Sequence, residues 1–388
     1  MPSNDAIPVT VVSGYLGAGK TTLINHVLSN PGGRRIAVIV NDMGEINVDA
    51  DRLERATEDD GIVDLSNGCI CCRLRGDLLE EATRLARSRE FDALLVEASG
   101  ISEPIPIAQV FTDGTDASDV DPTTLFRLDT MVTVLDTYGF WKEFDAGAQL
   151  PEGLQPDTER PLSEVLIEGI EFCDVLLLNK TDMVPDDVVT EIETVVNRLQ
   201  PRATRRRTSY CEVDPELVLD TGQFDFETAK RSPGWKRHLR GEHDHGHEEG
   251  SRDGEADVGH DHETHAHDAE PSAAERHGVS SFVFRADQPV HPVRLAAWLE
   301  DEDWDGSIIR AKGVCHVANR DEVIGISQAG PSVRAGPIGE WRPTDDRRTQ
   351  LVFIGRGMDE QRIRGELEAC VIDDDLEEAD AAVDPFPL

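Results

Sequence analysis

The chain has 388 residues and a formal charge of −39, because 77 Asp and Glu outnumber 38 Lys and Arg. This balance argues against a protein that binds the phosphate backbone of nucleic acids, and no apolar run approaches the roughly 20 residues of a membrane-spanning helix. The N-terminal MPSNDAIPV has no charged segment followed by an apolar one, so we expect a cytoplasmic protein rather than a secreted one.

Acidic residues are spread over the whole chain, and only six of the basic residues are Lys. A diffuse negative surface favours adaptation to a salt-rich, halophilic cytoplasm over the alternative of one site for a basic partner. The seven cysteines are an odd number, and three of them lie within residues 69–72. In a reducing compartment such a cluster indicates metal binding or redox chemistry rather than a disulfide framework.

Short apolar segments alternate with helix-like stretches in the first part of the chain. The predicted strands cover residues 9–12, 36–40, 93–96, 131–135 and 175–178. This alternation predicts parallel strands joined by crossover helices, and therefore a three-layer α/β domain over residues 1–235.

The first predicted strand leads into a complete G-x-x-x-x-G-K-[ST] phosphate loop, which a helix-like LINHVLSN follows. In such a loop the backbone N–H groups wrap the phosphates, Lys20 reaches the β- and γ-phosphates and Thr21 ligates Mg²⁺. The residues assigned to phosphates and Mg²⁺ are Gly14, Gly17, Ala18, Gly19, Lys20, Thr21 and Thr22.

Two acidic positions follow the next predicted strand, where a nucleotide-responsive switch would fall. Asp42 and Glu45 are candidate ligands of Mg²⁺ or of another metal, and a solvated acidic loop is the alternative. Further on, an apolar strand ends at Glu97, which we expect to hold Mg²⁺ or its water. Gly100 would then sense the γ-phosphate through its N–H group, unless this is a plain strand-to-helix turn.

Three soft thiols, Cys69, Cys71 and Cys72, stand within four residues and follow Gly68. Thiolates at this spacing suit Zn²⁺ or a related thiophilic ion, and the glycine permits the sharp turn that would bring them together. The fourth ligand could be Glu45, a His, water or the partner that receives the ion. A redox relay and buried structural cysteines are the competing interpretations.

A second nucleotide signature, N-K-x-D, ends the last predicted strand of this part at Asn179, Lys180 and Asp182. The aspartate can accept hydrogen bonds from both N1–H and the exocyclic amine of guanine, a pairing that adenine cannot supply. We therefore expect GTP as the nucleotide, with a capped turn as the alternative.

Residues 236–277 break the apolar pattern, so we expect a disordered linker there. Seven imidazoles and eight acids occupy the 25 positions from 243 to 267. Weak, exchangeable binding of Zn²⁺, Ni²⁺ or Co²⁺ follows from this ligand chemistry, and a passive linker is the alternative. The imidazoles are His243, His245, His247, His260, His262, His265 and His267.

A second apolar pattern begins at Ser281 and predicts a small α+β domain over residues 278–374, followed by an acidic tail at 375–388. The expected elements are a strand, a Pro-containing turn and a helix, then strands at 307–310, 314–318 and 351–354 and a helix at 359–369. Cys315 and His316 are adjacent on a predicted strand, so their side chains would point to opposite faces, and we interpret them as structural.

Taken together, these motifs resemble the CobW-like metallochaperone GTPases, relatives of the nickel-insertion GTPases for urease and hydrogenase. The forms NDM and GISEP and the DRR before LVFIG are most similar to the branch associated with zinc limitation. The departure is at residues 312–316, where that branch tends to have aromatic residues. The blocks that carry the resemblance are GYLGAGKTTLINHVL, NDMGEINVDA, LSNGCICCRLRGDLLEE, LLVEASGISEPIPIA, RLDTMVTVLD, LLLNKTD, SFVFRADQPVHPVRLAAWL, IIRAKG and DRRTQLVFIG.

The resemblance implies a GTP-hydrolysing metallochaperone that binds zinc at Cys69, Cys71 and Cys72 and delivers it to a client metalloprotein. Catalysis would rest on Lys20, Thr21 and Glu97, with slow intrinsic turnover. The alternatives are insertion of cobalt or iron for a metalloenzyme or corrinoid pathway, and a zinc buffer without catalysis. A homodimer is compatible with the sequence, which does not define the client, the native metal or the oligomeric state.

Overall fold

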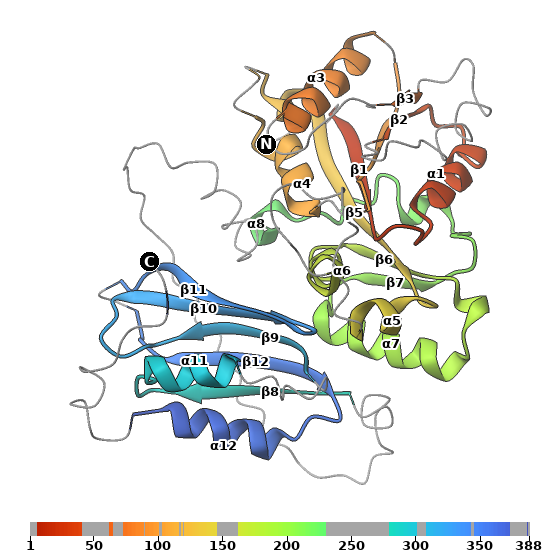
Figure 1. Cartoon of the computed structure of the whole chain (residues 1–388). Coiled ribbons are helices and arrows are strands. Elements are labelled where there is room, and N and C mark those ends of the chain that lie inside the picture. Colours follow the sequence, from red (N-terminus) through yellow and green to blue (C-terminus); the bar gives the residue numbers. More distant parts are fainter. Residues whose placement is uncertain are drawn as a thin grey trace, which may run out of the picture.

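The computed structural model describes residues 6–40, 62–64, 73–88, 90–100, 103–115, 118, 120–145, 162–229, 279–300, 308–342, 345–372 and 386. These residues form two parts, each built on its own sheet (Figure 1). The domain boundaries predicted at 235/236, 277/278 and 374/375 lie outside the described residues.

The first sheet has seven strands in the order β3-β2-β4-β1-β5-β6-β7, and every pairing in it is parallel. Residues of β1, β2, β4 and β6 are almost continuously apolar and buried, as expected for parallel strands covered on both faces. The strands are β1 (Ile7–Ser13), β2 (Ile36–Val40), β3 (Ile62–Asp64), β4 (Ala93–Glu97), β5 (Phe126–Asp136), β6 (Val175–Asn179) and β7 (Thr204–Arg207).

Helices cover both faces of this sheet, which makes the three layers expected from the sequence. Side chains of α3 and α4 pack on one face, and those of α1 pack on the other. Helices α5, α6 and α7 extend the first of these layers beside β5 and β6. The helices are α1 (Lys20–Ser29), α3 (Arg73–Ser88), α4 (Pro104–Thr112), α5 (Phe140–Asp145), α6 (Leu162–Glu171), α7 (Asp186–Leu199) and α8 (Phe226–Ala229), with short 3₁₀ turns η1 (Pro122–Thr124), η2 (Thr181–Met183) and η3 (Pro215–Leu217).

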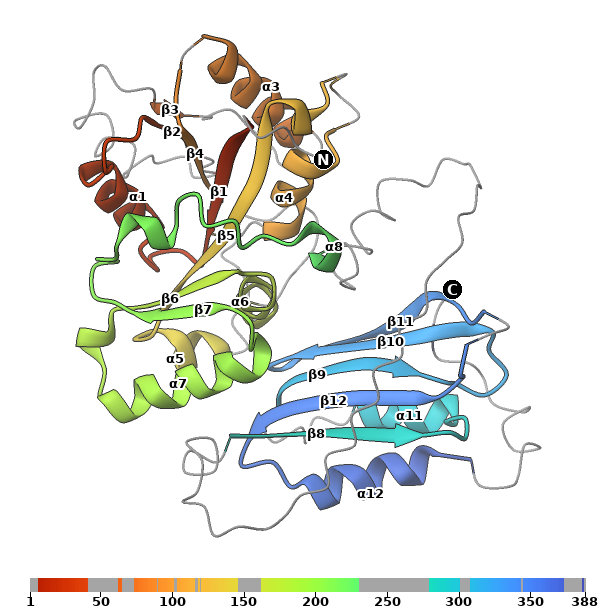
Figure 2. The ribbon, with the colours of Figure 1, turned by 180° about the vertical axis from the view of Figure 1, so that it is seen from behind.

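The second sheet is antiparallel, with the order β11-β10-β9-β12-β8, and its helices pack on one face. Figure 2 shows this sheet from behind, with α11 on its far side. The elements are β8 (Val279–Ala286), α11 (Pro292–Glu300), β9 (Ile308–Cys315), β10 (Glu322–Ala329), β11 (Ser332–Glu340), β12 (Thr349–Arg356) and α12 (Glu360–Cys370). The predicted fold class, a phosphate-loop-type α/β domain with a small α+β C-terminal domain, is confirmed.

The C-terminal strands differ from prediction in one respect. Residues 308–315 form the single strand β9, whereas the sequence suggested separate strands at 307–310 and 314–318. Pairing explains the difference, since β9 is hydrogen-bonded to β12 on one side and β10 on the other over nearly its whole length. Gly313 therefore lies within a strand, and Val317 makes only an isolated bridge with Val290.

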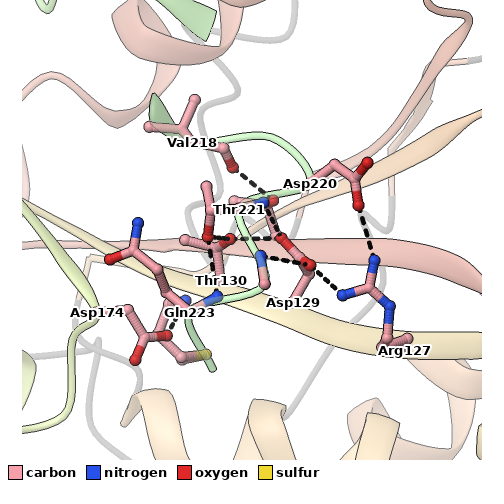
Figure 3. Close-up of polar contacts among 11 residues, drawn as sticks. Arg127, Asp129, Thr130, Asp174, Val218, Asp220, Thr221 and Gln223 are labelled. Carbon is pink, nitrogen blue, oxygen red and sulfur yellow. Dashed lines mark hydrogen bonds and ion pairs between the residues drawn. The ribbon is translucent and has the colours of Figure 1, made fainter. Parts of the chain in front are cut away.

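A strap, which we define as residues 212–225, crosses the first part from the carboxyl ends of the strands to their amino ends. It is anchored by Asp129 on β5, whose side chain is fully buried (Figure 3). The carboxylate accepts hydrogen bonds from Thr221 N at 2.7 Å and Gly222 N at 3.0 Å, and it pairs with the guanidinium of Arg127. Because buried carboxylates need such partners, Asp129 fixes the far end of the strap.

None of the described helices is long and apolar enough to cross a bilayer.

Candidate functional site

The phosphate loop lies between the end of β1 and the start of α1, with Lys20 as the first helical residue. Gly14, Gly17 and Gly19 all have positive φ, at 137°, 74° and 116°. A side chain at Gly14 would collide with the carbonyl oxygen of Val134, and one at Gly19 would approach Asn179 Nδ2 to 2.5 Å. Backbone geometry therefore favours glycine at all three positions, and close packing adds to this at Gly14 and Gly19, as a phosphate-wrapping loop demands.

Lys20, Thr21 and Glu97 come together at this loop. The Lys20 side chain is buried, and its ammonium donates to the carbonyl of Tyr15 at 3.4 Å. The Thr21 hydroxyl donates to Glu97 Oε1 at 2.8 Å, because parallel pairing of β1 and β4 brings the end of β4 beside the loop. A hydroxyl and a carboxylate next to a phosphate loop form an all-oxygen donor set that fits Mg²⁺.

Gly100 is also close to the phosphate loop. A Cβ at this position would lie 2.8 Å from the backbone nitrogen of Leu16, so only glycine allows the two segments to approach this closely. This approach brings Gly100 next to the phosphate loop, and sensing of the γ-phosphate by its N–H group stays a prediction. Thr22 is exposed on the first turn of α1, and Ala18 is buried beneath the loop.

Asn179 connects the phosphate loop to the base side of the site. Its buried amide donates to the carbonyl of Ala18 at 2.8 Å, and its carbonyl accepts from Cys211 N at 3.0 Å and Thr208 Oγ1 at 3.1 Å. Within the described structure its role is therefore to connect loops through side-chain hydrogen bonds.

Lys180 and Asp182 occupy the turn that follows. Lys180 has a φ of 62°, and its ammonium pairs with Asp136 Oδ2 at 2.6 Å. Asp182 is exposed in η2, so its carboxylate is open to a ligand from solvent. This arrangement fits guanine recognition at Asp182, which stays a prediction.

The sequence interpretation missed the segment 208–211, which borders the same site. Tyr210 and Cys211 both have a φ of 55°, and the Cys211 thiol donates to the carbonyl of Gly19 at 3.4 Å. Burial raises the pKa of Cys211 to about 12, so this thiol stays protonated and is a poor metal ligand. Only the position of the segment directly after β7 could have drawn attention to it, because its residue types match no motif.

Apart from Thr21 and Glu97, the candidate metal ligands fall outside the described residues. This holds for the thiols Cys69, Cys71 and Cys72, the switch acids Asp42 and Glu45 and the seven imidazoles of residues 243–267. Among the residues that are described, no three His, Cys, Asp or Glu side chains are grouped so as to hold a metal ion. Cys315 is buried in the C-terminal core, and burial raises the pKa of its thiol, which agrees with a structural role.

The site combines a glycine-rich loop after β1 with a buried lysine, a Thr–Glu pair and an Asn that connects the loop to the turn on the base side. These features define a phosphate-loop nucleotide-binding protein. Residues 8–206 match the family model described as CobW/HypB/UreG, nucleotide-binding domain. Residues 279–371 match the cobalamin synthesis protein cobW C-terminal domain. The chain therefore belongs to the CobW family and is a GTPase of that family, as the sequence motifs indicated.

Relatives of known name match along most of the chain. Zinc-regulated GTPase metalloprotein activator 1 of Dictyostelium discoideum is 35% identical, over 95% of this chain and 81% of the relative. A zinc chaperone CobW of a Sinorhizobium species is 30% identical, over 94% of this chain and 97% of the relative. The solved structure of Zn(II)-bound YjiA GTPase from E. coli covers 95% of this chain and 99% of its own, with 20% identity and a TM-score of 0.41.

Proposed function

We propose that this protein is a GTP-hydrolysing metallochaperone that binds zinc at Cys69, Cys71 and Cys72 and delivers it to a client metalloprotein. The assignment of GTP binding and hydrolysis rests on the Thr21–Glu97 hydrogen bond beside the buried Lys20. The assignment of zinc as the transported metal is supported by the thiol spacing and by relatives that are named for zinc.

The chemistry follows from the positions of three side chains. Lys20 would neutralise charge that develops on the β- and γ-phosphate oxygens, and backbone N–H groups of the loop would orient the same oxygens for in-line attack by water. Thr21 and Glu97 would hold Mg²⁺, which supplies further charge neutralisation when it is bound. Without an identified residue that orients the water, slow intrinsic turnover is expected.

The four described cysteines are poor candidates for the site that holds the transported metal, which favours the cluster at residues 69–72. Cys173, Cys211, Cys315 and Cys370 are free and buried, and burial raises the pKa of each. A thiol must lose its proton to bind zinc tightly, so these four are poorly suited to exchange an ion. The imidazoles of residues 243–267 would supply weaker sites.

Calorimetric titration of Zn²⁺ into the apo, GTP-analogue and GDP forms tests the proposal. One tight site is expected, with an affinity that changes roughly 5- to 150-fold with nucleotide, the range of typical couplings between sites. Cys71→Ser should abolish the tight site, and deletion of residues 243–267, as the matched control, should remove only weak sites.

The outcomes separate the alternatives. Equal zinc affinity in all three forms would favour a zinc buffer and contradict a chaperone cycle. Tighter and nucleotide-dependent binding of Co²⁺ or Fe²⁺ in the same titration would favour an insertion GTPase for another metal.

A further inference from the structure

Helix α6 makes contacts through two of its faces, and one of these faces borders the phosphate loop. Val165, Leu166 and Gly169 line a small pocket whose other wall includes Gly14 and Gly100. Both ribbon views place α6 at the junction between the first sheet and the strands of the C-terminal sheet (Figures 1 and 2). A shift of this helix would therefore change the space beside the phosphate loop.

Buried hydrogen bonds connect α6, through Thr133 on β5, to Ser13, the last residue of β1. The hydroxyls of Ser13 and Thr133 lie 2.9 Å apart, and Thr133 Oγ1 donates to the carbonyl of Gly169 at 2.8 Å. A side chain at Gly169 would be in van der Waals contact with Thr133 Cγ2 at 3.5 Å, so the helix is also packed closely on β5 here. Gly14, the first glycine of the phosphate loop, directly follows Ser13.

The opposite face of α6 contacts the C-terminal sheet. Ile167 belongs to an apolar cluster that it shares with Ile309 and Ala329, and Ser163 Oγ donates to the carbonyl of Ala329 at 2.8 Å. The cluster is drawn from both parts of the chain, so the position of α6 depends on the C-terminal sheet as well as on its own domain.

Glu171, the last residue of α6, makes a charged contact with two side chains of the C-terminal sheet. Arg310 donates to it twice, from Nε at 2.7 Å and from Nη2 at 3.0 Å, and Lys312 Nζ adds a third bond at 3.0 Å. The Arg310 side chain is only 5% exposed and also donates to Ser327 Oγ, so its fork is held in place by β10. A two-bond contact of this kind fixes direction as well as distance.

We propose that Glu171 is a positioning residue for the nucleotide site, through which the C-terminal sheet holds α6 against β5 and the phosphate loop. Glu171 lies two residues after Gly169. The contact of Gly169 with β5 and the contact of Glu171 with the C-terminal sheet therefore act on the same helical turn. The proposal rests on the proposed GTP binding and hydrolysis, and it makes the C-terminal domain part of the machinery that sets nucleotide affinity.

The test compares two interdomain ion pairs in the full-length protein. Glu171→Gln removes the charge at α6, and Glu191→Gln removes the charge that pairs with Arg356 at 3.0 Å from α7, a helix that does not line the pocket. We expect Glu171→Gln to raise the GTP dissociation constant and KM at least about fivefold, within the range of couplings carried by packed networks, and to change kcat less. Glu191→Gln should stay within about twofold of wild type.

Stability is measured alongside, because a merely structural role would lower Tm without moving GTP affinity at low temperature. If Glu171→Gln does not fold, Arg310→Lys keeps the charge but loses the fork, and it should show a smaller effect in the same direction. Equal GTP affinities for the Glu171 and Glu191 variants would overturn the positioning role. Failure of wild-type protein to bind GTP would instead contradict the proposed function itself.

Discussion

Replacing Asn179 with alanine should weaken both the fold and the nucleotide site, and the structure allows the size of the effect to be worked out. The change removes the donor to the carbonyl of Ala18 and the acceptor of Cys211 N, and both residues are buried. Each buried polar group left without its partner costs about 1–3 kcal/mol, so for the two groups we expect a loss of roughly 2–6 kcal/mol. For a domain of this size that corresponds to a fall of about 4–24 °C in Tm.

The assay is thermal unfolding of the apo protein together with GTP titration well below Tm. Asp182→Ala is the matched control, because this exposed side chain belongs to the same motif but holds no loop in place. The control should lose GTP affinity at unchanged apo Tm, whereas Asn179→Ala should lose both. An apo Asn179→Ala protein as stable as wild type would refute the bridging role that we assign to the amide.

Three further changes have clear expectations. Burial raises the pKa of Asp174 to about 6, so the folded state retains a proton that the unfolded chain has lost, and stability from this group falls as the pH rises from about 4 to 6. Asp174→Asn, which can still accept from Met131 N, should therefore raise Tm at pH 7.5 and change it less at pH 4. Asp129→Ala should lower the free energy of unfolding in urea by about 3–5 kcal/mol, because it breaks a buried ion pair and releases the strap. Asp220 is half-exposed and pairs with the same guanidinium, so Asp220→Ala should lower it by under about 1 kcal/mol. Asp182→Asn should shift preference from guanosine to xanthosine nucleotides in competition binding, and hydrolysis of ATP as fast as GTP by the unaltered protein would contradict the guanine assignment.

The features that the sequence predicted well are those with local signals. Buried parallel strands are short, continuous apolar runs, and the phosphate loop is defined by glycines at fixed spacing, so five parallel strands of the first sheet and the positions of Lys20 and Thr21 could be anticipated. Glu97 was also anticipated, because it is the acid that ends a buried strand.

The features that were missed depend on residues far apart in the chain. The contact of Cys211 with Gly19 and that of Arg310 with Glu171 join segments separated by 192 and 139 positions. No spacing rule connects such pairs, and the residue types alone suggest only a buried thiol and a surface arginine. The joining of two predicted strands into β9 has the same cause, since its neighbours β10 and β12 lie beyond it in the chain.

The apolar cluster shared by the two sheets has a practical consequence for protein production. A truncated chain ending before Val279 would leave Phe144, Ile167 and Val195 without the C-terminal side chains that cover them. Newly exposed apolar surface of this kind promotes association between copies. Precipitation or oligomers of such a fragment would then report on an uncovered face of α6 and α7, and its kinetics would be a poor substitute for those of the full-length protein.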